Sequence, residues 1–170
     1  TQRAKAREFQ AVWNFLEELP RVPLIVTPGN HDVPLYRFWE RLTLPYRSWS
    51  RNIPRDLDSV TVVPGATVVA LNSASPWSAI VGGRITRAQL RFARESFENE
   101  PTLGGRVLVI HHHFICKSTG GGGRPLPAAP GILKHIEEMG VDVVLSGHLH
   151  RMQVAMSRDL LPGEGSGVPL

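Results

Sequence analysis

The chain has 170 residues, of which 42% are apolar and 20% are charged. These proportions are those of a globular domain and exclude a fibrous or an intrinsically disordered chain. The net charge of +4 favours anionic ligands such as phosphate esters, but the arginines are scattered along the sequence and give little support to nucleic-acid binding.

The single cysteine, Cys116, excludes an internal disulfide and favours a reducing compartment, so we expect a cytoplasmic protein. Cys116 itself is expected to be an ordinary, partly buried thiol. No apolar run has the length of a membrane span, and no secretory signal is visible at Thr1. The missing initiator methionine indicates a fragment.

The predicted elements alternate between helices and short apolar strands. An amphipathic helix over 2–19 is expected to lie on a sheet, with Phe9, Trp13 and Phe15 in the core. A buried strand over 22–27 runs into Pro28-Gly29, and two further strands, 60–63 and 67–71, flank Pro64-Gly65. The later elements are a helix opened by a capping box at 86–89 and ended at Pro101, a strand over 107–110, a Gly-rich loop over 118–123, a helix over 131–139 and a strand over 141–145.

This order of elements predicts an α/β fold with a largely parallel or mixed sheet. In such sheets ligands bind beyond the carboxyl ends of the strands. Six of the seven histidines lie at those ends, in three blocks over 29–32, 111–113 and 147–150. The loops that carry these blocks are therefore expected to converge in space.

Histidine clusters of this kind predict a metal site assembled from loops. The uncharged Asn30 side chain would supply an oxygen ligand without neutralising the ion. His148 and His150, two residues apart, would point to the same side of an extended segment, and Gly147 would let the backbone approach the site closely. Among the tryptophans, Trp39, Trp49 and Trp77 would either line a substrate pocket or simply cover the sheet.

The three blocks and their order resemble the calcineurin-like metallophosphoesterases. The His111-His112-His113 run, followed by Phe114, is most similar to the bacterial branch that hydrolyses cyclic nucleotides. The resemblance covers residues 1–157 as a partial phosphoesterase domain and leaves 158–170 as a Gly- and Pro-rich tail. It implies a layered αββα fold with a mixed sheet that lacks its first strands, and hydrolysis of a small phosphodiester by a metal-bridged hydroxide.

The resemblance also implies the roles of individual residues. Asn30, His111 and His148 would bind one metal ion and His150 the other, with His112 as the substitute for His111. His31 would be the catalytic histidine that donates a proton to the leaving oxygen, and Asp32 the carboxylate that orients it. The intact protein would hold two divalent ions, of manganese, iron or zinc, of which the residues present here would retain one at most.

Two motifs of the family, an Asp-x-His and a Gly-Asp, do not occur in the chain. We therefore expect a piece of a larger phosphoesterase, cut just after the second motif and inactive by itself. Two alternatives stay open, namely a binding or scaffold module that keeps the fold without catalysis and a nuclease. Neither the substrate nor the oligomeric state follows from the sequence.

Overall fold

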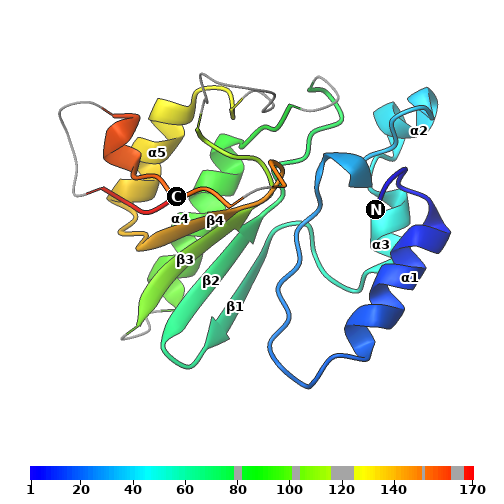
Figure 1. Cartoon of the computed structure of the whole chain (residues 1–170), viewed down its shortest axis with the longest axis horizontal. Coiled ribbons are helices and arrows are strands. Elements are labelled where there is room, and N and C mark those ends of the chain that lie inside the picture. Colours follow the sequence, from blue (N-terminus) through cyan, green and yellow to red (C-terminus); the bar gives the residue numbers. More distant parts are fainter. Residues whose placement is uncertain (79–81, 101–103, 116–124, 151, 162–166) are drawn as a thin grey trace.

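The structure, a computed structural model, describes residues 1–78, 82–100, 104–115, 125–150, 152–161 and 167–170 (Figure 1). Its helices and strands form a mixed α/β fold, which confirms the predicted fold class. Cys116, Pro101 and the Gly-rich loop lie outside the described residues, so the predictions for them stay predictions.

A four-stranded sheet with the order β1-β2-β3-β4 forms the centre of the fold. Strands β1 (Ser59–Val63) and β2 (Ala66–Leu71) are an antiparallel hairpin that turns at Pro64-Gly65, where Gly65 has a φ of +84°. Strands β3 (Gly105–Ile110) and β4 (Val143–Ser146) join β2 in parallel. Because β2, β3 and β4 run in the same direction, their carboxyl ends meet at one edge of the sheet.

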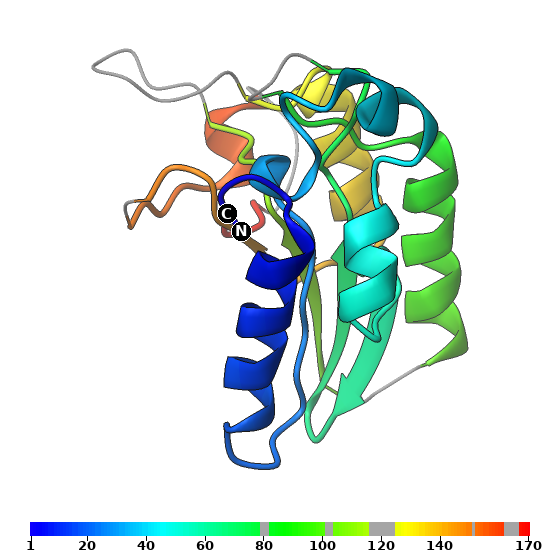
Figure 2. The same cartoon turned by 90° about the vertical axis from the view of Figure 1, so that its right-hand side faces the viewer.

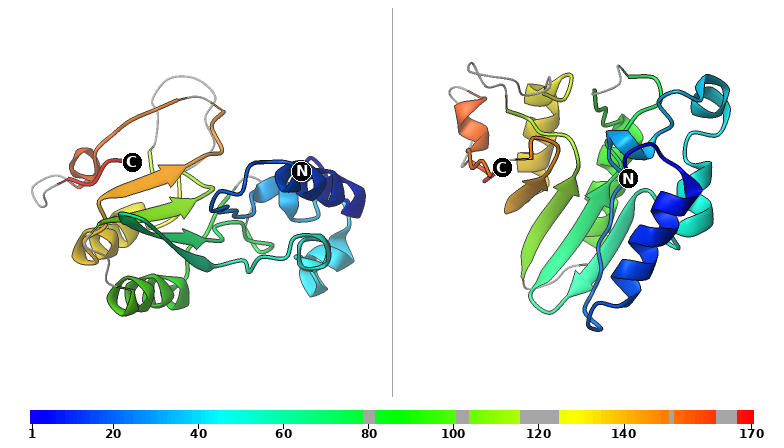
Figure 3. Two further views of the ribbon diagram at one scale, coloured as in Figure 1. Left: turned by 90° about the horizontal axis from the view of Figure 1, so that it is seen from below. Right: turned by 45° about the vertical axis from the view of Figure 1, so that its right-hand side comes forward.

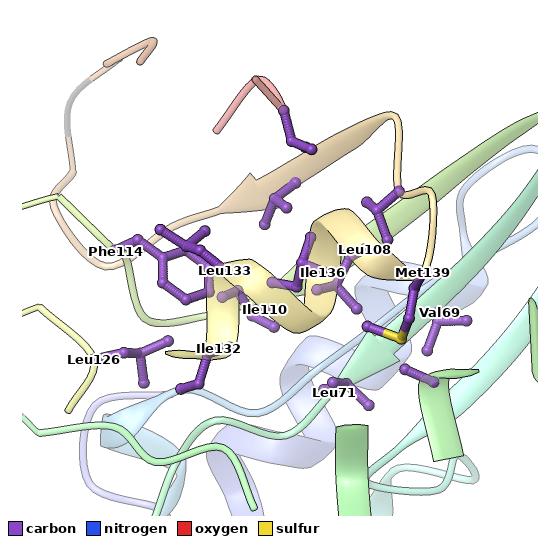
Figure 4. Packing of buried hydrophobic residues seen from close by; sticks show 14 of the residues in the cluster. Val69, Leu71, Leu108, Ile110, Phe114, Leu126, Ile132, Leu133, Ile136 and Met139 are labelled. Atoms are coloured by element: carbon purple, nitrogen blue, oxygen red, sulfur yellow. The ribbon is translucent and has the colours of Figure 1, made fainter. Parts of the chain in front are cut away.

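Helices α4 (Arg87–Asn99) and α5 (Ala129–Glu138) cover one face of this sheet (Figure 3). The predicted capping box opens α4, since the Thr86 hydroxyl accepts from the Gln89 N–H at 3.2 Å and Gln89 Oε1 accepts from the Thr86 N–H at 2.9 Å. The main core lies between sheet and helices, where Leu133 and Ile136 of α5 pack beside Leu108 of β3 (Figure 4).

Helix α1 (Ala6–Glu17) packs against a helix rather than on the sheet, which corrects the sequence prediction. The stretch after the first histidine block forms two short helices, α2 (Phe38–Thr43) and α3 (Arg47–Asn52). Phe9 of α1 meets Trp49 of α3 edge to face at 6.2 Å between ring centroids, and both are buried. Phe15, predicted to be in the core, is 61% exposed because α1 buries only the narrow stripe that faces α3.

The predicted strand over 22–27 is wrong, because this segment is extended but pairs with none of the described strands. Figure 2 shows it running between α1 and the sheet. The backbone groups of Leu24, Ile25 and Val26 make no hydrogen bond to any described residue. A cleft of about 820 Å³ separates the segment from β1 and is lined by Leu24, Trp49 and the 59–61 part of β1.

The chain after β4 folds back onto the core. Pro169 O accepts from the Val144 N–H at 2.8 Å, and Val168 is buried in the main core. The short 3₁₀ helix η2 (Ser157–Asp159) precedes this return.

The opposite face of the sheet, by contrast, is apolar and only partly covered, since Leu145 is 52% exposed. No described helix is long and apolar enough to cross a bilayer.

Candidate metal centre

The three histidine blocks meet beyond the carboxyl ends of the strands, as predicted. The first block forms the 3₁₀ helix η1 (Asn30–Asp32), and Thr27 Oγ1 ties its approach to the end of β2 by donating to Leu71 O at 3.1 Å. The third block is joined to the second by a bond from the Gly147 N–H to His111 O at 3.1 Å. Parallel pairing of β3 and β4 places these two blocks side by side.

Asn30, His111 and His148 come together with the spacing of ligands around one ion. His111 Nε2 lies 3.0 Å from Asn30 Oδ1 and 3.2 Å from His148 Nδ1. Zinc forms bonds of about 2.0–2.2 Å to nitrogen and oxygen, which places neighbouring ligand atoms of one shell roughly 3.0–3.5 Å apart. The donor set and its spacing therefore fit a divalent transition metal.

His112 belongs to the same cluster and has one nitrogen free for a ligand. Its side chain is completely buried, and its Nδ1 is 2.8 Å from Ser73 Oγ. Its Nε2 is buried without a hydrogen-bond partner among the described residues. A hydrogen bond at one ring nitrogen that leaves the other available is typical of metal-binding histidines. Three ring nitrogens, one from each of His111, His112 and His148, lie within 4.8 Å of one another.

The histidine pKa values favour metal binding over proton binding at neutral pH. Burial lowers the pKa of His111 to about 4 and that of His112 to about 3, and the neighbouring histidines act in the same direction. Burial and the nearby His113 also lower the pKa of His148. These rings are therefore neutral at pH 7, and their lone pairs are available to a cation.

Two glycines allow the close packing of this cluster, and neither is the one expected. A Cβ at Gly29 would lie 2.7 Å from His111 Cε1, and one at Gly83 would lie 2.3 Å from His112 Cγ. At Gly147 a Cβ would meet nothing closer than 3.7 Å, so space does not require glycine there. The sequence prediction did not include Gly83 or Ser73 in the site. Ser73 could have been predicted, because it follows β2 and so lies at the same edge of the sheet as the histidines.

The segment around the third block is not extended, which corrects the argument that His148 and His150 share a face. Both residues have left-handed backbone, with φ of 66° and 50°. Such a conformation is costly for residues other than glycine and is concentrated at functional sites. His148 points into the cluster, whereas His150 is exposed and is not part of the three-histidine group.

His31 and Asp32 lie in the same loop as Asn30 but do not pair with each other in the described structure. The His31 ring is exposed, with Nδ1 3.2 Å from Gln2 O. Asp32 accepts from the Gly29 N–H at 2.8 Å and from Thr1 Oγ1 at 2.7 Å. The Asp32 carboxylate therefore fixes the loop rather than the His31 ring.

The calcineurin-like phosphoesterase family model matches residues 4–152, which is most of the chain. The chain belongs to this family. A comparison with curated proteins found no match. Membership supports a phosphoesterase that depends on metal ions, and the family typically binds two divalent ions. The cluster of His111, His112 and His148 is able to hold one of them.

Proposed function

We propose that the chain carries the nitrogen-rich half of the metal centre of a phosphodiesterase. The observation that carries this proposal is the convergence of Asn30, His111, His112 and His148 from three separate loops. Asn30, His111 and His148 bind one ion, His112 is a further or alternative ligand, and His150 serves the second ion. When bound, divalent ions polarise the phosphate ester and activate water.

His31 is proposed as the proton donor to the leaving oxygen. Its imidazole is exposed and His31 is adjacent to Asn30 in the chain, so His31 lies at the rim of the metal cluster. Asp32 positions His31 through the backbone, because the Asp32 carboxylate accepts a hydrogen bond from the Gly29 N–H and closes the turn. This role differs from the direct pairing with His31 that the sequence led us to expect.

The carboxylate half of a two-ion centre is proposed to come from chain outside residues 1–170. The cleft beside β1 supports this proposal, since the extended backbone at Leu24 on one wall and the outer side of β1 on the other pair with no strand that the structure describes. Inserted strands would satisfy both walls. A second sheet would likewise cover the apolar face at Leu145, as the αββα arrangement requires.

A small phosphodiester, with a cyclic nucleotide as the preferred candidate, is the proposed substrate. The Arg41 guanidinium, on α2, donates hydrogen bonds to Pro34 O, Pro76 O and Ser75 O. These bonds connect the loop after Asp32 to the loop after β2, which supports a substrate-binding surface formed by the two loops. Trp39 and Trp77, carried by these connected segments, are 77% and 70% exposed. Exposed aromatic rings of this kind can stack on a nucleobase.

Metal binding by the 170-residue chain tests the first part of the proposal. We expect calorimetry with Mn²⁺ or Zn²⁺ to give one ion per chain, and His148→Ala to weaken binding by about tenfold or more. His135→Ala is the matched control, because His135 is exposed on α5 and contacts Glu138 instead of the cluster. Equal affinity in the two variants would show that the cluster is not the metal site.

Hydrolysis tests the second part and needs a version extended through the upstream coding sequence. We expect this version to hydrolyse bis(p-nitrophenyl) phosphate with Mn²⁺, and His31→Ala to reduce turnover while the metal content stays unchanged. Full turnover in that variant would refute the role of His31. Metal binding by the extended version without hydrolysis of the ester would favour the alternative of a binding or scaffold module.

A further inference from the structure

A groove between α4 and α5 is lined by cationic side chains and lies apart from the metal centre. Its volume is about 420 Å³, and its walls are Arg87, Arg91 and Arg94 of α4 with His135 of α5, around Leu90. This size is within the range of small-molecule sites, roughly 300–1,000 Å³. The two helices lie side by side on the sheet in both views (Figures 1 and 3).

The arginines form a row along α4 because they stand four and then three residues apart. At 1.5 Å of rise per residue, the row extends for about 10 Å. Leu90 lies between the first two in sequence and gives the groove an apolar element. An elongated anion with several charges would therefore meet all three guanidinium groups at once.

Among the described residues, one direct ion pair neutralises part of this positive charge. Arg94 Nη2 is 3.5 Å from Glu138 Oε2, and His135 Nδ1 is 3.2 Å from the same oxygen. The guanidinium groups of Arg87 and Arg91 make no hydrogen bond or ion pair with any described residue. Of the carboxylates near the row, Glu138 makes an ion pair with Arg94, while Glu95 and Glu98 lie one turn along α4 without a direct ion pair among the described residues. An external anion would therefore add to the neutralisation of the row.

We propose that this groove binds an oligophosphate anion. A guanidinium group donates two parallel hydrogen bonds to phosphate oxygens, and a row of three matches a chain of phosphates better than a single phosphate. Either a condensed inorganic phosphate or the polyphosphate chain of a nucleotide has this chemistry. The short length of the row, with Glu138 beside its Arg94 end, favours such a compact anion over a long nucleic-acid backbone.

Titration of the 170-residue chain with sodium tripolyphosphate at low ionic strength and with EDTA tests the proposal. We expect one site per chain, and a loss of about tenfold or more in affinity for Arg87→Gln combined with Arg91→Gln. The matched control is Arg7→Gln with Arg21→Gln, which removes the same charge from two exposed arginines near α1. The control should retain its affinity within about twofold. Circular dichroism checks that both variants are folded.

Additional titrations distinguish a nucleotide from an inorganic polyphosphate, and the groove from the metal centre. EDTA removes metal-mediated binding, and His148→Ala should keep full affinity for tripolyphosphate because the metal cluster is not involved. Equal affinities for ATP and tripolyphosphate would identify the phosphate chain as the recognised group, whereas tighter binding of ATP would identify a nucleotide. Absence of binding at about 1 mM ligand, or equal losses in the two double variants, would overturn the proposal. Binding of a DNA duplex through the same arginines without binding of tripolyphosphate would also overturn it.

Discussion

The contact between Gly83 and His112 gives the sharpest test of how the metal cluster is held. A Cβ at position 83 would lie 2.3 Å from His112 Cγ and 2.6 Å from its Nδ1. Carbon atoms in contact prefer about 3.5–4.0 Å, so Gly83→Ala creates an overlap of more than 1 Å. The His112 side chain has no exposed surface through which to escape. We expect a loss of about 1–3 kcal/mol in the free energy of unfolding, the usual cost of overpacking.

The same substitution should weaken metal binding, since the His112 ring can move only by giving up its bond to Ser73. Loss of such a supporting bond typically lowers metal affinity by about 10–100-fold. Urea unfolding with EDTA and calorimetric titration with Zn²⁺ measure the two effects separately.

Gly131→Ala is the control for this experiment. Gly131 lies within α5, and a Cβ there would have no neighbour within 4 Å. Alanine should therefore stabilise the protein by about 0.4–1 kcal/mol and leave metal affinity unchanged. If Gly83→Ala is as stable as Gly131→Ala and binds Zn²⁺ equally well, the proposed packing around His112 is refuted.

Two other measurements address the same cluster. Ser73→Ala removes the partner of His112 Nδ1 and the acceptor for the His111 and His112 N–H groups, at 3.2 and 3.0 Å, and should lower Zn²⁺ affinity by about tenfold or more. Ser50→Ala, at an exposed position of α3, should leave Zn²⁺ affinity unchanged in the same titration. Metal-free stability should also depend on pH, because the pKa values of His111 and His112 fall from 6.5 in the unfolded chain to about 4 and about 3 in the folded protein. Below pH 6.5 the unfolded chain binds protons that the folded chain does not, so stability should decrease by at most about 1.4 kcal/mol per pH unit for each group, until about pH 4 for His111 and about pH 3 for His112. Urea unfolding between pH 4 and pH 8 measures this slope, and a profile that is flat, or identical after His111→Asn with His112→Asn, would contradict it.

Local patterns in the sequence were sufficient for much of the fold. The capping box at Thr86, the turn at Pro64-Gly65 and the apolar strand before His111 are each determined by neighbouring residues, and the structure confirms them. The convergence of the histidine blocks also followed from sequence, because parallel strands bring their carboxyl ends to one edge.

Only the tertiary structure decided which partners these elements have. Whether residues 22–27 form a strand depends on a neighbour to pair with, and α1 packs on α3 because Trp49, distant in sequence, covers Phe9. The same holds within the metal cluster. The order of residues identified the three histidine blocks, but the place of His112 beside His111 depends on Ser73 and on the missing Cβ of Gly83. Contacts of this kind join residues far apart in the chain, so no local pattern encodes them.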